Sequence, residues 1–92
     1  MNKPTFQSGL KELIARLASP SIISIYGEIG AFNTHLNAAF QDGITKCPPL
    51  TSQEMDDVTD RVKGIRRDPH GDVAQYIKVL LRDRGMEAEF LD

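Results

Sequence analysis

Six apolar residues in the middle of this chain recur at alternating steps of three and four. They are Ile22, Ile25, Ile29, Phe32, Leu36 and Ala39. Because an α-helix completes a turn in about 3.6 residues, this spacing places all six on one side of a helix. Ser19 is a suitable cap, Pro20 suits the first helical position, and Gly43 suits the position after the last turn. The pattern predicts one long helix over residues 20–41.

A second interpretation of this segment stays open. Residues 21–26 are β-branched enough to form a short strand. Gly27 and Gly30 each cost about 1 kcal/mol in a helix interior, which favours a break in the chain after such a strand. The sustained helical spacing outweighs this local preference, so we expect the helix.

Helices are also predicted on both sides of this segment. Residues 6–18 carry apolar side chains at helical spacing, with Thr5 or Ser8 as the cap. Thr51 and Glu54 form a capping box at the start of a third helix, and residues 68–71 have turn chemistry. The expected inward positions are Leu10, Leu13, Ile14 and Leu17 in the first helix, and Met55, Val58, Val62 and Ile65 in the third.

The C-terminal part contains a fourth predicted helix over residues 72–84, ended by Gly85 in the left-handed conformation. Val73, Ile77, Leu80 and Leu81 are its inward positions. Residues 86–91 alternate apolar and acidic, which predicts an edge strand or an extended tail. The fold class expected is mainly α, a single-domain bundle of about four helices over residues 1–92, or α+β with short strands near 21–26 and 86–91.

Composition limits the classes of protein open to this chain. A length of 92 residues suffices for one core, and 40% hydrophobic with 26% charged residues is ordinary globular usage. The N-terminus lacks the apolar centre of a signal peptide and no apolar run approaches the ~20 residues of a bilayer span, so we expect a cytoplasmic protein without membrane contact. Cys47 is expected to be an incidental loop thiol. His35 and His70 lack ligand spacing, so no metal, cofactor, small-molecule substrate or catalytic residue is expected.

Basic residues are unevenly distributed along the chain. None lies between Leu17 and Thr45, whereas seven of the eleven lie between Arg61 and Arg84. The candidate nucleic-acid-binding residues are Arg61, Lys63, Arg66, Arg67, Lys78 and Arg82. Acidic residues in the first turns and basic residues in the last turns of the third helix also complement its macrodipole, which explains the cations without any ligand. Both explanations stay open, although four cations without an anion over residues 61–67 favour nucleic acid.

The outward side of the predicted helix over residues 20–41 carries one formal charge among seven positions. So neutral a surface either packs inside the domain or binds a partner protein. The candidate protein-binding residues are Ala31, Thr34, His35 and Ala38.

The whole chain resembles a family of small phage-encoded type I-F anti-CRISPR proteins. The resemblance lies in length and overall sequence, with no short motif, and runs through MNKPTFQSGLKELIARL, IGAFNTHLNAAFQDGITKCPPLT and HGDVAQYIKVLLRDRGMEAEFLD. It implies a non-enzymatic inhibitor in the cytoplasm of an infected bacterium, where the protein would bind the RNA-guided surveillance complex and block its access to target DNA. The partners implied are the backbone and large Cas subunits and the guide RNA.

Two other classes of protein fit the residues. The third and fourth helices suit a helix-turn-helix regulator with Gln75, Lys78 or Arg82 over the DNA major groove. The negative net charge and the proline in the intervening turn count against this class. An antitoxin or assembly factor that acts through protein contact alone is the other alternative.

Overall fold

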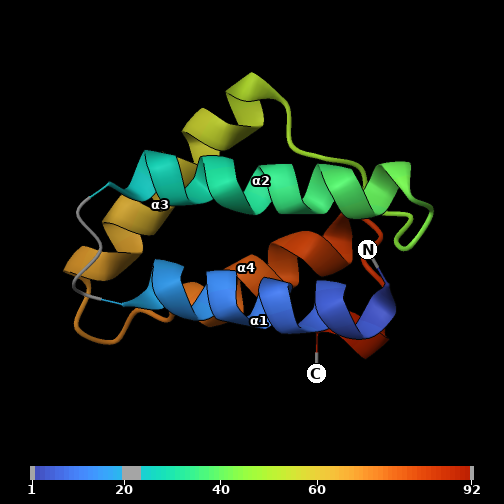
Figure 1. The fold of residues 1–92 in the computed structure, drawn as a ribbon. Coiled ribbons are helices and arrows are strands. Elements are labelled where there is room, and N and C mark those ends of the chain that lie inside the picture. The colour runs from blue at the N-terminus through green and yellow to red at the C-terminus, as the bar shows by residue number, and fades with distance from the viewer. Residues whose placement is uncertain (1, 20–23, 92) are drawn as a thin grey trace.

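A computed structural model describes residues 2–19 and 24–91 (Figure 1). In this part of the chain the elements are α1 (Lys3–Ala18), α2 (Ile25–Gln41), α3 (Ser52–Arg67), α4 (Val73–Asp83) and a short 3-10 helix, η1 (Ala88–Phe90). No strand occurs among these residues. The prediction of a small, mainly helical bundle is therefore confirmed.

Helix α1 begins earlier than its apolar spacing predicts. Asn2, rather than Thr5 or Ser8, is the cap, and its side-chain oxygen accepts a hydrogen bond from the Thr5 amide at 3.0 Å. Pro4 is tolerated in the first turn because amides there have no helical partner. The helix ends at Ala18, and Ser19 is its extended C-cap.

Helix α2 begins later than predicted. Its cap is Ser24, whose hydroxyl accepts a hydrogen bond from the Gly27 amide at 3.2 Å, so Ser19 is not the cap of this helix. Pro20, predicted at the first helical position, lies outside the described residues. The alternative of a short strand over 21–26 does not hold for Ile25 and Tyr26, which are helical, whereas residues 20–23 lie outside the described part of the chain. The helix continues through both glycines without a break. Burial of one apolar face offsets their cost, since that face supplies Ile29, Phe32, Leu36 and Ala39 to the core.

The remaining helix ends follow the predicted capping chemistry. Thr51 and Glu54 form the capping box of α3, and the Asp72 carboxylate caps α4 by accepting a hydrogen bond from the Gln75 amide at 3.0 Å. Gly43 and Gly85 adopt the left-handed conformation, with φ of 74° and 97°. These three features confirm the predicted ends.

The strand predicted near residues 86–91 is wrong. This segment turns into η1, in which Ala88 is exposed while Met86, Phe90 and Leu91 are buried, so burial does not alternate along it. Phe90 is buried with its ring edge-on to Phe6, at a centroid separation of 4.9 Å. Burial of Met86, Phe90 and Leu91 against α1 and α4 therefore outweighs the apolar-acidic alternation that suggested a strand.

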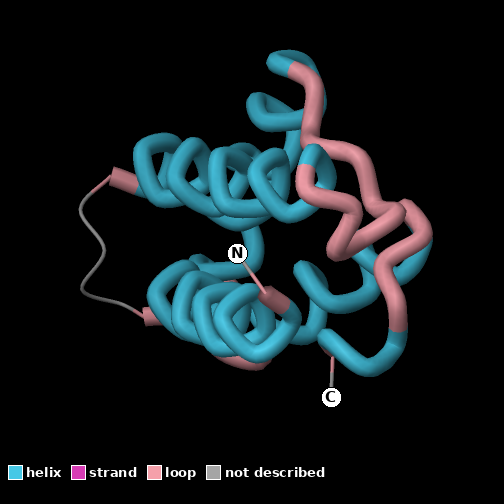
Figure 2. Tube along the Cα trace, turned by 45° about the vertical axis from the view of Figure 1, so that its right-hand side comes forward, coloured by secondary structure: helices cyan, strands magenta, loops and turns pink. Residues whose placement is uncertain are grey.

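The helices enclose one core. Helix α1 packs against α2 and α4, and α3 crosses α2 and leads to α4 through a short turn (Figures 1 and 2). The buried side chains of the described residues form a single cluster around Phe6, Leu10, Phe32 and Leu36. Cys47 lies in the loop before α3, as expected, and it belongs to this cluster, where it is fully buried. None of the described helices has the length and apolar character needed to cross a bilayer.

Candidate interaction surfaces

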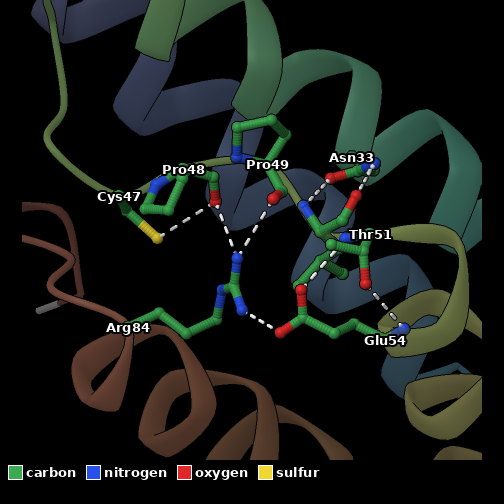
Figure 3. A network of polar contacts seen from close by, with 8 residues as sticks. Asn33, Cys47, Pro48, Pro49, Thr51, Glu54 and Arg84 are labelled. Carbon is green, nitrogen blue, oxygen red and sulfur yellow. Dashed lines mark hydrogen bonds and ion pairs between the residues drawn. The ribbon is translucent and has the colours of Figure 1, made fainter.

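Arg84 forms the centre of a polar network at one end of the bundle (Figure 3). Its guanidinium donates to the Glu54 carboxylate and to the carbonyl oxygens of Pro48 and Pro49, the latter two at 3.2 and 3.0 Å. The Arg84 side chain is only 16% exposed. This cation therefore joins α4, α3 and the loop before α3, and is not available to a ligand.

Two further contacts hold the same loop. Asn33 donates to the Leu50 carbonyl at 3.0 Å and accepts from the Leu50 amide at 2.5 Å, so its side chain joins α2 to the loop. Hydrogen bonding by the Thr51 amide, assisted by the Arg84 charge, lowers the pKa of the Glu54 carboxyl. Glu87 fixes the beginning of the loop by accepting hydrogen bonds from the Thr45 hydroxyl at 2.6 Å and the Lys46 amide at 2.9 Å.

The four candidate cations of α3 have three different environments. Lys63 and Arg67 are exposed, and neither forms a hydrogen bond through its side chain or an ion pair with a described residue. Arg66 is half-buried, and its guanidinium donates to the Ser19 carbonyl, which links α3 to the end of α1. Arg61 lies over the Tyr76 ring, with its guanidinium carbon 5.7 Å from the ring centroid. Among these four, Lys63 and Arg67 are thus the two whose side chains have no bonding partner in the described part of the chain.

The Arg61–Tyr76 pair lies beside a hollow between α3 and α4. This hollow has a volume of about 360 Å³ and is lined by Asp60, Arg61, Gly64, Ile65 and Tyr76. Burial raises the pKa of the Tyr76 phenol, although the nearby Arg61 charge acts in the opposite direction. Sequence reasoning missed Tyr76 because the pairing depends on how α3 and α4 cross. The only indication in the sequence was the presence of a tyrosine on the flank of α4, an amphipathic helix with basic residues.

The two candidate cations of α4 do not form one continuous basic surface with the Arg61–Tyr76 pair. Lys78 is half-buried in a groove shared with α1, together with Lys11. Residues 76 and 78 lie about 200° apart around the helix axis, so Lys78 and the Arg61–Tyr76 pair occupy different flanks of α4. Arg82 is exposed on the outward side. The six predicted nucleic-acid-binding residues therefore do not form one continuous surface.

The outward side of α2 is exposed and uncharged. We call this surface the α2 face, and define it by the exposed residues Tyr26, Gly27, Ala31, Thr34, Asn37 and Gln41. Thr34 satisfies its hydroxyl within the helix by donating to the Gly30 carbonyl at 3.0 Å. Ala38 is half-buried, and Glu28 is paired with Arg16 at 2.8 Å. Two of the predicted protein-binding residues, Ala31 and Thr34, thus lie on the exposed face itself.

His35 is turned toward α1, away from the α2 face. Its ring stacks on Phe6 at a centroid separation of 5.1 Å, and its Nε2 lies 3.1 Å from the Phe6 carbonyl oxygen. An added Cβ at Gly9 would lie 2.6 Å from the ring, so the absence of a side chain there makes room for the imidazole. The interpretation of His35 as an outward residue is therefore wrong, because helix α1 covers it.

The described residues contain no group of three or more His, Cys, Asp or Glu side chains that could hold a metal ion. What they define is a small helical domain with an uncharged exposed face on α2 and exposed cations on α3, where Lys63 lies about 200° around the helix axis from Arg61 and its contact with Tyr76. No family model matches the chain, and neither the curated proteins nor the solved structures compared with it include a match.

Proposed function

We propose that the protein is a non-enzymatic inhibitor of a type I-F CRISPR surveillance complex, which it binds through guide RNA and Cas subunits. The resemblance described above supplies the identity of this target. The observation that carries the RNA contact is the pair of uncommitted cations, Lys63 and Arg67, on the same helix as the Arg61–Tyr76 hollow. The α2 face is the proposed contact with protein.

The basic end of α3 suits single-stranded RNA. Unstacked bases bind to aromatic rings and to the planes of arginine guanidinium groups, and phosphates bind cations. The helix macrodipole gives a reason for basic residues only within the last turn of a helix. The macrodipole therefore explains Arg66 and Arg67 but not Arg61, which precedes the last turn and lies over the Tyr76 ring. This difference favours a ligand over charge placement alone.

The α2 face suits contact with a protein. Interface cores are depleted of charged residues, and this face has none among its exposed members. Tyr26 adds an aromatic side chain that is 50% exposed. Tyrosine is among the residue types that dominate binding energy at protein interfaces.

In such a complex, base pairing between guide and target reads the sequence, while the protein subunits hold the guide and admit DNA. A small domain that covers the guide prevents pairing without reading any sequence. Inhibition is then competitive with target DNA and requires no catalytic residue. The proposed mechanism is steric and electrostatic exclusion.

The experiment measures affinity of the purified protein for the guide-loaded complex across a range of salt concentrations. The variant Lys63→Glu/Arg67→Glu is expected to weaken binding and to reduce the slope of log K against log salt concentration by about 0.7 for each lost phosphate contact. The control is Lys11→Glu, a charge reversal on α1. Equal affinity and equal salt slopes for the double variant and the wild type would show that α3 does not contact phosphate.

A second pair of variants tests the α2 face. Ala31→Arg is expected to weaken binding to the complex while thermal stability stays within about 0.5 kcal/mol of wild type, because the side chain is exposed. Ser8→Arg, at an exposed position of α1, is the matched control. If both variants bind as wild type does, partner proteins do not dock on the α2 face.

The same preparation distinguishes the two other classes of protein. A sequence-specific shift of duplex DNA by the protein alone, lost in Gln75→Ala or Arg82→Ala, would favour a helix-turn-helix regulator. Tight binding to a protein partner in the complete absence of nucleic acid would favour an antitoxin or assembly factor. The proposed inhibitor does neither.

A further inference from the structure

A groove between α1 and α4 lies on a different flank of α4 from the Arg61–Tyr76 hollow. It has a volume of about 340 Å³ and is lined by Lys11, Ile14, Ala15, Ala74, Lys78, Phe90 and Leu91. The proposed function makes no use of it. The groove is closed at one side by η1 and the residue after it, which the sequence suggested would be a strand.

The floor and walls of this groove are apolar. Ile14, Phe90 and Leu91 belong to the core and are nearly covered, so they form a closed base. Ala15 is exposed on α1 and Ala74 half-buried on α4, and their short side chains leave the hollow above that base. A larger residue at either position would fill it.

Two lysines are the only charged residues that line the groove among those described, and both lack a partner. Neither Lys11 nor Lys78 forms a hydrogen bond through its side chain or an ion pair with a described residue. Lys78 is half-buried. A partly desolvated ammonium group favours an anion close by, and no carboxylate of the described chain lines this groove to supply one.

We propose that this groove binds a small amphiphile made of an apolar chain and one carboxylate. The chain would lie over Ala15 and Ala74, and the carboxylate would lie between Lys11 and Lys78. The volume is at the lower end of the ~300 to 1,000 Å³ of small-molecule sites, which suits a ligand of about a dozen heavy atoms and excludes a docked helix. A free phosphate would satisfy the lysines but would gain nothing from the apolar floor.

The test uses decanoate, kept well below its critical micelle concentration, and observes the methyl resonances of the full-length protein by NMR. Saturable shifts are expected at Ala15, Ala74 and Leu91, with no shift at Ala31 on the α2 face. Shifts of equal size at Ala31 would indicate non-specific partition and would overturn the proposal. So would a titration without any shift.

Two comparisons separate the contribution of charge from that of the groove. Decanol, which has the same chain without the carboxylate, is expected to bind at least tenfold more weakly, as is decanoate to Lys11→Glu/Lys78→Glu. Ala15→Leu is expected to abolish binding by filling the hollow, and the exposure of that site makes the variant compatible with folding. Unchanged affinity in either variant, or equal binding of decanol, refutes this site. Inhibition of the surveillance complex is measured separately and does not depend on these outcomes.

Discussion

Replacement of Arg84 by alanine is expected to destabilise the domain more than any other change of a basic residue. The variant removes three contacts at once, to the Glu54 carboxylate and to the Pro48 and Pro49 carbonyls. Those three acceptors belong to α3 and to the loop before it, so their loss loosens the attachment of α4 to both. Arg84 itself is largely buried, which makes its contacts harder for water to replace.

The magnitude follows from the contacts. A net contribution of about 1 kcal/mol is ordinary for each hydrogen bond to a carbonyl, and an ion pair with a carboxylate that is 37% exposed adds roughly 0.5 kcal/mol after solvent screening. The expected loss is therefore about 2 to 3 kcal/mol. A chain of this length has a total stability of roughly 5 to 14 kcal/mol. The melting temperature would fall by roughly 10 to 20 °C.

Urea denaturation followed by circular dichroism measures this loss, with Arg82→Ala as the matched control. Arg82 lies on the same helix and is exposed, with no side-chain contact to a described residue, so its replacement should change stability by no more than about 0.5 kcal/mol. A double-mutant cycle with Glu54→Gln isolates the ion pair. If Arg84→Ala and Arg82→Ala are equally stable, the network in Figure 3 does not hold the loop.

Three further predictions concern single side chains. The pKa of Glu54 is lowered in the folded protein, so its stabilising effect is present above the unfolded pKa near 4.5 and is lost as pH falls through the folded pKa. Urea titrations across acidic pH should therefore show a smaller loss of unfolding free energy in Glu54→Gln than in the wild type. Gly64→Ala should raise stability by about 0.5 to 1 kcal/mol because its Cβ meets open space. Gly9→Ala should lower stability because its Cβ would push the His35 ring off Phe6. The same stability change in both variants would contradict this reasoning. Burial raises the pKa of the Cys47 thiol, so a thiol reagent at neutral pH should modify it only after unfolding, and rapid modification of the native protein would show that the site is open.

The regular part of the fold could be predicted from sequence because helix caps and apolar spacing are local. Thr51 with Glu54, and Gly85 after α4, were identified from the residue types alone, and the structure has them in the expected roles. The start of α2 was misplaced because Ser19 and Ser24 are equally good caps by residue type. The tail was misjudged because burial against α1, a contact between distant parts of the chain, decided its form.

The surfaces were harder to predict than the helices. Spacing showed which side of α3 carries cations, but not that Arg61 lies over Tyr76 or that Arg66 donates to the Ser19 carbonyl. Each of those contacts depends on the crossing of two helices, which no local pattern encodes. The position of His35 against Phe6 was missed for the same reason.

The loop over residues 42–51 has no regular structure, yet hydrogen bonds hold several of its backbone amides. The amide of Leu50 donates to Asn33, that of Lys46 to Glu87, and that of Cys47 to the Thr45 hydroxyl. Irregular segments usually open without unfolding of the rest of the domain, and their amide protons therefore exchange quickly with solvent. Here the amide protons of Lys46 and Leu50 are released only when distant parts of the chain separate, so deuterium should enter these two positions about as slowly as it enters the core helices.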